Sequence, residues 1–302
     1  IVVIGTAACV PVANALICEY MPASSKARAV SVFNLGLFLG GASGTVVGQS
    51  LGFPSAFILL GAPGFAIALL VLLLRLGDPT GSPEAARAAK KRALDSSEYR
   101  ISDLLRNGTY RWTVLGAVLM AFAAGAYLAW FFDFLQKAKG ATEKEALFIL
   151  MVSLGTGLAG VLCGGWVADR LVRRWPFGRQ AAVAIGIGSS VPLALAVLYL
   201  PLGGTFYLCS WLLMFTINWY HAPLVASVDD LVPVERSGLA QGLYIATMHL
   251  CGTAPAAWIV GRIAEDLGLQ TALLVPTAAM LLAALTFVVS FRGVTAARVV
   301  KA

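Results

Sequence analysis

The sequence has few charged residues. Asp, Glu, Lys and Arg make up 12% of its 302 residues, whereas 59% are hydrophobic. Soluble globular domains carry about a quarter charged residues, and a soluble helical protein needs polar faces at helical spacing in most of its apolar segments. Those faces are absent here, so the composition excludes a large soluble helical protein and indicates a membrane protein.

Catalytic and metal-binding motifs are also missing. The sequence has no HExxH, no GxSxG and no glycine-rich loop followed by a phosphate-binding lysine. Its two histidines lie on different expected spans, and its five cysteines occur singly. We therefore predict no catalytic residue, no metal and no cofactor, and we expect the cysteines to be small packing residues.

Long hydrophobic segments run along the whole chain. A helix of about 20 apolar residues can cross a bilayer. Nine such segments are predicted, which indicates an all-α polytopic membrane protein. They cover residues 1–21, 29–50, 54–76, 112–135, 145–168, 179–200, 204–228, 237–262 and 268–291.

Lysine and arginine gather on one side of these spans. If the loop after the first span is cytoplasmic, 18 of the 22 Lys and Arg residues lie on that side. This asymmetry follows the positive-inside rule, so we expect a multi-pass protein of the bacterial inner membrane with a cytoplasmic C-terminus. The net charge of +7 then needs no nucleic-acid partner.

One polar segment interrupts the spans and predicts the domain organisation. Residues 77–111 open with Pro, Gly and Ser and continue as EAARAAKKRALD, which indicates a cytoplasmic linker with a short polar helix. The linker is expected to separate a partial N-terminal bundle of three helices, residues 1–76, from a C-terminal six-helix bundle, residues 112–302.

An internal repeat relates the first three spans to the last three. ICEYMPASSKARAVSV and VDDLVPVERSGLAQGL both read apolar span, acid, proline, short basic turn and new span. Glu19 matches Asp230, and Arg28 lies near the equivalent of Arg236, at an offset of about 211 residues. Such duplication is typical of secondary transporters, whose two halves rock about a site near the midplane.

The stretch GGWVADRLVRRWPFGR, residues 164–179, resembles the signature loop of the major facilitator superfamily, Gly-x-x-x-Asp-Arg followed by a basic cluster. The resemblance implies the major facilitator fold, with the nine spans corresponding to helices 4–12 of twelve and the first three helices preceding Ile1. Residues 171–177 make the spacing within this loop longer than is usual. Stretches such as GTAACVPVANALICEYMPASSKARAVSV and AYLAWFFDFLQKAKGATEKEA resemble the Spinster-like branch.

The resemblance and the repeat together predict a gate. The Asp169 carboxylate is expected to face the N-terminus of the helix that starts near Arg28, whose partial positive charge favours an anion by about 0.3–1 kcal/mol. Glu19 is expected to pair with Arg170 or Arg173 when the cytoplasmic ends approach. The alternative is that Asp169 only ends its helix. The predicted gating residues are Glu19, Arg28, Gly165, Asp169, Arg170, Arg173, Asp230 and Arg236.

Glycines recur at helical spacing in two spans. They predict seams where helix backbones approach closely, and the alternative is the general abundance of glycine in membrane helices. One set is Gly36, Gly40, Gly41, Gly44 and Gly48, and the other is Gly155, Gly157, Gly160, Gly164 and Gly165.

The substrate site is expected near the midplane, among polar and aromatic side chains. INWYHAP, residues 217–223, places several of them beside a proline that frees backbone groups. His221 is also the candidate for carrying a coupled proton, because histidine titrates near neutral pH; the alternative is a structural histidine. The candidate substrate-binding residues are Asn14, Asn34, Tyr127, Asn218, Trp219, Tyr220, His221, Gln241 and Tyr244, with His249 as a further lining residue.

These features predict a secondary active transporter and no enzyme. The expected substrate is a small organic or amphiphilic molecule, such as an organic anion or a lysolipid-like molecule, moved by alternating access in a symport or antiport with protons. The expected partners are this substrate, protons and the lipid bilayer, and the protein is expected to be a monomer. The alternatives are a transport-incompetent receptor or scaffold of the same fold, and a membrane-embedded enzyme.

Overall fold

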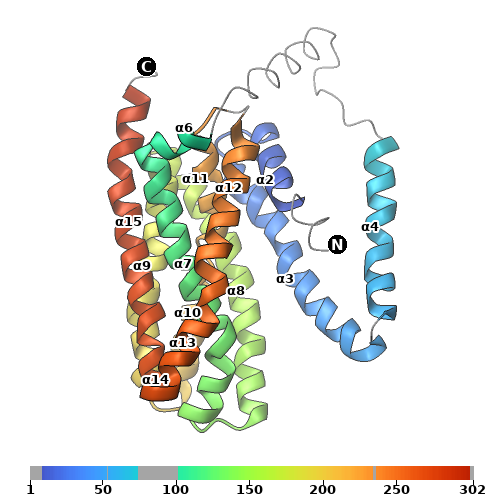
Figure 1. Cartoon of the computed structure of the whole chain (residues 1–302), viewed down its shortest axis with the longest axis vertical. Coiled ribbons are helices and arrows are strands. Elements are labelled where there is room, and N and C mark those ends of the chain that lie inside the picture. Colours follow the sequence, from blue (N-terminus) through green and yellow to red (C-terminus); the bar gives the residue numbers. More distant parts are fainter. Residues whose placement is uncertain (1–8, 53, 74–100, 234–235, 300–302) are drawn as a thin grey trace. The chain divides into compact units, whose positions relative to one another are not determined.

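The computed structural model describes residues 9–52, 54–73, 101–233 and 236–299, and every regular element among them is a helix (Figure 1). Most of the predicted linker, including its short polar helix, lies outside the described residues. The first eight residues of the first predicted span also lie outside them.

The described chain forms two compact units, and each is considered by itself. The larger unit joins the described residues up to Asn34 with those from Ile101 onward. The smaller unit contains the described residues from Leu35 to Leu73. The predicted domain boundaries at residues 76 and 111 stay predictions.

The N-terminal part of the chain supplies three helices. Helix α2 and the start of α3 belong to the larger unit, while the rest of α3 and α4 make up the smaller one. Gly52 lies in the turn between α3 and α4 with a φ of 66°, a left-handed conformation that glycine adopts without strain. The bounds are α2 Cys9–Tyr20, α3 Lys26–Leu51 and α4 Ser55–Leu73.

The remaining helices form a bundle in the larger unit. Capping residues mark where two of them begin: Asn107 accepts a hydrogen bond from the Tyr110 N–H, and Thr142 and Glu145 form a reciprocal capping box. The bounds are α6 Ile101–Arg106, α7 Gly108–Asp133, η1 Phe134–Ala138, α8 Glu143–Val172, α9 Gly178–Tyr199, α10 Gly204–Ile217, α11 His221–Asp230, α12 Ser237–Met248, η3 His249–Thr253, α13 Ala254–Leu267, α14 Leu269–Ala272 and α15 Leu274–Val299.

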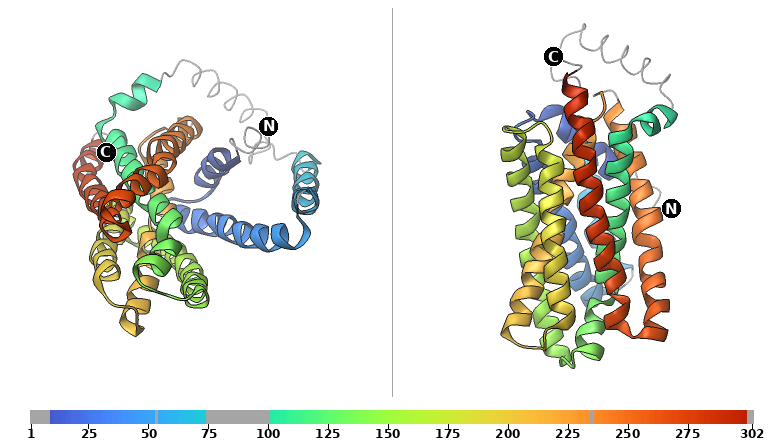
Figure 2. Two further views of the ribbon diagram at one scale, coloured as in Figure 1. Left: turned by 60° about the horizontal axis from the view of Figure 1, so that its bottom comes forward. Right: turned by 90° about the vertical axis from the view of Figure 1, so that its left-hand side faces the viewer.

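Small residues allow helices of the bundle to pack closely. Helix α15 lies between α7 and α9, and α8 packs against α10 (Figure 2). A Cβ added at Gly160 would come 2.0 Å from the Phe215 carbonyl oxygen, and one added at Gly164 would come 2.1 Å from that of Trp219. These glycines therefore form the close helix contact that their spacing predicts.

The second predicted glycine seam is not seen among the described residues. A Cβ added at Gly36, Gly40, Gly44 or Gly48 would meet no atom within 4 Å in the described chain. These four glycines belong to the smaller unit, so a contact partner for this face of α3 stays a prediction.

The all-helical membrane fold is confirmed, but the count of nine spans is not. Five helical stretches among the described residues are long and apolar enough to cross a bilayer. The predicted span 204–228 is two helices, α10 and α11, because the chain leaves the helix at residues 218–220. Asn218 contributes to this break, since its side-chain amide donates to the Met214 carbonyl oxygen at 2.8 Å. Predicted span 237–262 is likewise interrupted by the π-helix η3.

The internal repeat has a structural counterpart. Helix α3 begins at Lys26 and α12 begins at Ser237, which preserves the offset found in the sequence. The preceding helices, α2 and α11, end at Tyr20 and Asp230, within one residue of the same offset. The repeat therefore sets where helices of the two halves end and begin.

Candidate functional site

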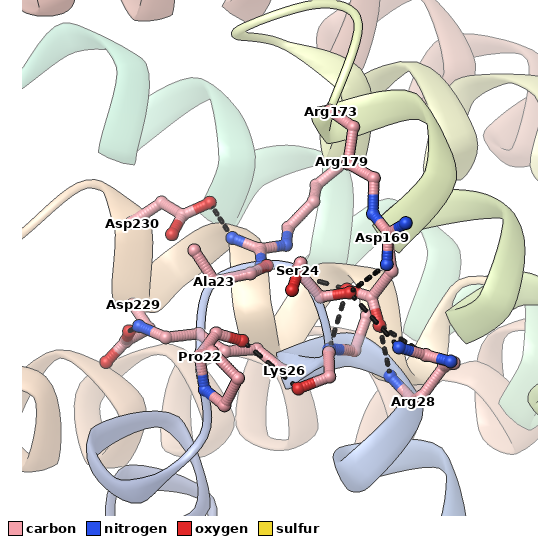
Figure 3. A network of polar contacts seen from close by, with 12 residues as sticks. Pro22, Ala23, Ser24, Lys26, Arg28, Asp169, Arg173, Arg179, Asp229 and Asp230 are labelled. Carbon is pink, nitrogen blue, oxygen red and sulfur yellow. Dashed lines mark hydrogen bonds and ion pairs between the residues drawn. The ribbon is translucent and has the colours of Figure 1, made fainter.

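Six ionisable side chains meet where α8, α9 and α11 contact the turn between α2 and α3 (Figure 3). We call this group the charged cluster. It contains three cations and three carboxylates, so its formal charges balance. Its members are Lys26, Arg28, Asp169, Arg179, Asp229 and Asp230.

Asp169 is the centre of the charged cluster. Its side chain, from the last turn of α8, is almost completely buried, with a residue exposure of 1%. Its two carboxylate oxygens accept hydrogen bonds from the backbone N–H groups of Ala27, at 3.1 Å, and Arg28, at 2.9 Å. These groups lie in the first turn of α3, where a helix has no carbonyl partners of its own.

The Asp169 carboxylate therefore caps α3 from a different helix. The residue that precedes α3, Ser25, does not take this role, because its hydroxyl donates to the Pro22 carbonyl oxygen at 3.3 Å. The carboxylate also meets the positive end of the α3 dipole. The contact between Asp169 and the helix that starts near Arg28 is thus present, as the sequence predicts.

Arg179 connects the turn to two helices. It is the second residue of α9 and has an exposure of 1%. Its guanidinium donates to Asp230 Oδ2 and, at 2.5 Å, to the Ala23 carbonyl oxygen (Figure 3). Arg179 Nη2 also lies 3.8 Å from Asp169 Oδ1. One buried side chain thus bonds to α11 and to the α2–α3 turn.

Lys26 and Asp229 form a second connection between the same elements. Lys26 Nζ lies 2.5 Å from Asp229 Oδ2, and the other Asp229 oxygen accepts a hydrogen bond from the Ser237 hydroxyl at 2.5 Å. Lys26 is the first residue of α3 and Ser237 is the first residue of α12. Asp229 therefore links the starts of the two helices that the repeat relates.

Small residues allow α3 to approach α8 closely enough for this bonding. A Cβ added at Gly165 would come 2.0 Å from Ser31 Oγ and 2.7 Å from the Ala27 carbonyl oxygen. The Ser31 hydroxyl is within bonding distance, 2.9 Å, of the Val161 carbonyl oxygen on α8. Four fully buried alanines from α3, α8, α9 and α11 pack together beside the cluster: Ala27, Ala168, Ala182 and Ala226.

The loop between α8 and α9 is held by aromatic stacking. The rings of Trp175 and Phe177 lie 6.1 Å apart, and that of Phe177 lies 4.9 Å from Phe291 on α15. Both loop aromatics belong to residues 171–177, which lengthen the signature loop. The extra residues therefore anchor the loop to α15, and Arg179 still reaches the cluster from the start of α9.

Burial gives the charged cluster a large effect on the stability of this contact. Asp169 and Arg179 are both almost fully inaccessible to water. Removing one partner of such a buried pair costs about 3–5 kcal/mol, because the other charge is left without compensation. The contact between α3 and the bundle therefore breaks only if water or another partner replaces several charged hydrogen bonds together.

Five of the predicted gating residues lie in this region with defined contacts. Arg28 Nε is 3.4 Å from Asp169 Oδ2, and Gly165 supplies the close approach. Asp230 binds Arg179, and Arg173 donates to the Ser24 carbonyl oxygen at 3.4 Å. The structure therefore brings together Arg28, Gly165, Asp169, Arg173 and Asp230.

The predicted pairing of Glu19 with Arg170 or Arg173 is wrong for the described residues. Glu19 is exposed near the end of α2, and neither arginine forms an ion pair with it. The Arg170 guanidinium instead lies over the Trp166 ring, 5.7 Å from its centroid. Arg173 instead donates to the Ser24 carbonyl oxygen, in the turn after α2. Arg236, the residue before α12, donates its backbone N–H to the Pro233 carbonyl oxygen at 2.9 Å.

Three members of the charged cluster are not among the predicted gating residues: Lys26, Arg179 and Asp229. Asp229 and Asp230 are adjacent in a helix and so project about 100° apart, which allows each to meet a different cation. Two consecutive acidic residues at the end of a helix are the sequence signal that could have indicated two separate ion pairs. The arginine that ends the signature stretch, Arg179, is the second signal, since it lies in the first turn of α9.

The candidate substrate-binding residues are distributed over α2, α3, α7, the break between α10 and α11, α11 and α12. Tyr127 bonds to the Thr277 hydroxyl at 2.8 Å, and Gln241 donates to the Val225 carbonyl oxygen at 2.8 Å. Tyr220 stacks on His221, with ring centroids 4.3 Å apart, and Tyr244 is buried. His249 is exposed, and its Nδ1 lies 3.2 Å from the Thr253 hydroxyl.

Some of these candidates keep polar atoms without a partner. The side-chain oxygens of Asn14 and Gln241 and the indole nitrogen of Trp219 are buried and have no hydrogen-bond partner among the described residues. Asn34 is half-buried on α3. Buried groups of this kind usually bond to water or a ligand, so Asn14, Trp219 and Gln241 keep their candidate role as a prediction.

Comparison with curated proteins finds transporters and Spinster proteins. The chain is 24% identical to Protein spinster homolog 3 of Danio rerio over 286 residues, which cover 87% of this chain and 56% of the relative. It is 25% identical to the D-galactonate transporter of Escherichia coli over 308 residues, covering 92% and 69%. Protein spinster of Drosophila melanogaster is 26% identical, covering 87% and 45%. The chain thus spans about half the length of the Spinster relatives.

Solved transporter structures share the fold. FucP in the outward conformation matches with a TM-score of 0.67 at 18% identity, covering 93% of this chain and 72% of FucP. A bacterial homolog of the human lysosomal transporter Spinster, in an inward-facing and unoccupied conformation, matches with a TM-score of 0.59 at 17% identity, covering 93% and 74%.

A family model completes the assignment. The model for the Major Facilitator Superfamily matches residues 1–252, which is most of the chain. The resemblance of residues 164–179 to the signature loop of this family agrees with that match. The protein is an integral, multi-pass membrane protein that belongs to the major facilitator superfamily, and its relatives include Spinster proteins.

Proposed function

We propose that the protein is a secondary active transporter that works by alternating access, and that the charged cluster closes its cytoplasmic side. The single observation that carries the proposal is the cap that Asp169 provides to α3. A carboxylate of the C-terminal bundle binds the backbone of a helix from the N-terminal half. This contact can exist only while the two halves touch at this end.

Such a contact is what a two-state transporter needs. A conformational equilibrium shifts only through interactions that differ between its two states. In the closed arrangement the first-turn N–H groups of α3 bond to Asp169, and in the open arrangement water must replace this carboxylate. The charged cluster therefore favours the state that is closed to the cytoplasm and open to the outside.

The proposed substrate is a small organic or amphiphilic molecule, either an organic anion or a lysolipid-like molecule. The name of the D-galactonate transporter supports the organic-anion class. The lysolipid-like class rests on the resemblance to the Spinster-like branch. We place the protein as a monomer in the bacterial inner membrane, with its C-terminus in the cytoplasm. The distribution of Lys and Arg in the sequence supports this orientation.

Proton coupling through His221 is part of the proposal. Its imidazole stacks on Tyr220 at the start of α11, directly after the break between α10 and α11. A backbone break at membrane depth is tolerated where it is buried in protein or lines a cavity. If His221 carries the proton, His221→Gln should abolish uphill uptake driven by a pH gradient while leaving counterflow of substrate intact.

Uptake into proteoliposomes tests the proposal. D-galactonate and a lysophospholipid, both radiolabelled, serve as probes for the two substrate classes. Asp169→Ala should reduce the uptake rate of the transported probe, because the cytoplasmic side no longer closes stably. Asp266→Ala is the matched control, since Asp266 is exposed on α13 and has no ion-pair partner among the described residues.

The outcomes separate the proposal from its alternatives. Unaltered uptake in folded Asp169→Ala would remove the gating role of the charged cluster while leaving transport itself in place. Failure of the unaltered protein to move either probe, with binding of one of them retained, would favour a receptor or scaffold. Chemical conversion of a bound probe would favour a membrane-embedded enzyme.

A further inference from the structure

A pocket lies at the end of the bundle away from the charged cluster. Arg179 lies in the first turn of α9, and Tyr199 is the last residue of the same helix, so the two mark opposite ends (Figure 1). Around Tyr199 is an open pocket of about 930 Å³, formed with η1, α13 and α14. Ligand pockets commonly have volumes of about 300–1,000 Å³. The lining residues that matter here are Trp130, Lys137, Tyr199, Trp258, Gly261 and Arg262.

Trp130 forms a fixed apolar wall of this pocket. Its indole N–H donates to the Ala257 carbonyl oxygen at 2.9 Å. Its ring rests on Gly261, where an added Cβ would come 2.7 Å from Trp130 Cζ2. Because the only polar atom of the side chain is already bonded, Trp130 can offer a ligand only its ring. The rotamer is set before a ligand arrives, which lowers the entropic cost of binding.

The side of the pocket formed by α13 combines an aromatic ring with a cation. Trp258 and Arg262 are four residues apart and therefore lie on the same face of the helix. Trp258 is 71% exposed, so its ring is accessible from outside the bundle. A ring on this face and the ring of Trp130 give the pocket two aromatic surfaces.

The cations of the pocket are free to exchange their partners. Arg262 lies 2.5 Å from Glu265 and Lys137 lies 2.9 Å from Asp133, but all four side chains are exposed to water or half-exposed. Exposed pairs of this kind contribute about 0–1 kcal/mol. An incoming anion can therefore replace either carboxylate at little cost. Arginine is also well suited to a planar or tetrahedral oxyanion, because its guanidinium donates in a fork.

We propose that this pocket binds an organic anion with a flat apolar body. The rings of Trp130 and Trp258 contact the apolar body, and Arg262 and Lys137 bind the acid group. The proposal goes beyond the transport function, because binding here requires neither turnover nor the charged cluster. It assigns a site at the end of the bundle that the proposed topology places on the outside.

Calorimetric titration of the purified protein in amphipol tests this site. The probe is naphthalene-2-sulfonate, and naphthalene-2-sulfonamide is its uncharged counterpart. Arg262→Gln combined with Lys137→Gln should weaken binding of the sulfonate about fivefold, the size expected for exposed charge pairs, and leave binding of the sulfonamide unchanged. Trp130→Leu should weaken both probes about three- to tenfold, as loss of an aromatic contact predicts.

Matched controls come from the opposite end of the bundle. Arg174→Gln and Trp112→Leu remove an exposed arginine and an exposed tryptophan that do not line the pocket. They should leave the affinity for both probes unchanged. The proposal is overturned if the controls weaken binding as much as the pocket variants do. It is equally overturned if the two probes bind alike to every variant, or if the unaltered protein binds neither probe.

The test is independent of the gate. Asp169→Ala should retain the affinity for naphthalene-2-sulfonate, because Asp169 lies near the other end of the bundle. A protein that binds the probe but shows no transport would support the pocket and refute the transport proposal. If the protein transports normally but Trp130→Leu leaves its affinity for both probes unchanged, the transport proposal would be supported and the pocket proposal refuted.

Discussion

Replacing Gly165 by alanine should open the cytoplasmic side without changing any charge. The added Cβ would lie 2.0 Å from Ser31 Oγ and 2.7 Å from the Ala27 carbonyl oxygen, whereas ordinary contact begins at 3.4 Å. The start of α3 must therefore withdraw from α8 by about 1 Å, since packed helices have no free volume to absorb the methyl group. Hydrogen bonds of 2.9 and 3.1 Å to Asp169 would then lengthen to about 4 Å, beyond bonding range.

The magnitude follows from those two bonds. Each hydrogen bond to a charged acceptor contributes about 1.5–3 kcal/mol, and water that enters the opened gap recovers part of this. A net loss of about 2–3 kcal/mol reduces the ratio of closed to open protein about 30- to 150-fold. Helix propensity acts in the opposite direction by no more than about 1 kcal/mol, because alanine favours a helix over glycine.

Cys18 provides the assay. Its exposure is 1%, and it lines a small pocket together with Lys26 and Asp229 of the charged cluster. Opening of the cytoplasmic side should expose its thiol to N-ethylmaleimide, so the alkylation rate reports the open fraction. The assay needs a protein in which the other four cysteines are alanine, namely Cys9, Cys163, Cys209 and Cys251.

Gly155→Ala is the matched control for this prediction. Gly155 lies on the same helix, and an added Cβ would meet no atom within 4 Å in the described chain. We expect Gly165→Ala to accelerate Cys18 alkylation by one to two orders of magnitude, about the fold-change given above, and Gly155→Ala to leave it unchanged. Equal rates in the two variants would refute the reasoning that close packing of α3 on α8 holds the side closed.

Two further predictions concern single ion contacts. Lys26→Asp or Asp229→Lys alone should accelerate Cys18 alkylation, because each breaks the ion pair between these residues. Combining the two changes should slow alkylation again, because the swapped pair can re-form. Additive effects of the two changes would contradict a direct pair. Lys139→Met should lower the melting temperature more than Lys144→Met, because the Lys139 ammonium donates to two carbonyl oxygens at the end of α9, each at 2.8 Å. Burial lowers the pKa of Lys139 below its usual 10.5. The unaltered protein should therefore gain stability relative to Lys139→Met as the pH rises toward 10.5, because the neutral amine is favoured in the folded state. A gain in relative stability as the pH is lowered would contradict this prediction.

Much of the site could be predicted from the sequence because it depends on local pattern. The glycines and the aspartate of residues 164–169 mark where a helix meets the membrane surface, and the repeat indicates which helix start lies opposite. Both are properties of chain position and helical spacing. Together they locate Asp169 at the N-terminus of α3, and the structure has this contact.

The identity of the ion pairs could not be predicted in the same way. Which cation meets Asp229 or Asp230 depends on the rotation of α11 about its axis and on the length of the α8–α9 loop. Glu19 matches Asp230 in the repeat, but it is exposed and, among the described residues, forms no ion pair with Arg170 or Arg173. The repeat therefore fixes helix ends better than it fixes side-chain partners.

The break between α10 and α11 shows a second limit of sequence reasoning. Residues 204–228 are apolar enough for one long helix, and hydrophobicity alone predicts no interruption. The side-chain amide of Asn218 bonds back to its own helix, and Pro223 follows without a backbone N–H to donate. Local hydrogen bonding of this kind overrides the hydrophobic pattern at the point where candidate substrate residues gather.

The distance between the α2 end and the α8–α9 loop tests the central claim most directly. Spin labels at Glu19→Cys and Arg174→Cys, both exposed positions, report whether the two halves touch beside the charged cluster. Double electron–electron resonance on the cysteine-free protein should show a population of short distances that Asp169→Asn largely removes and Asp266→Asn retains. A short-distance population of equal size in Asp169→Asn would contradict the proposal that the charged cluster holds this side closed.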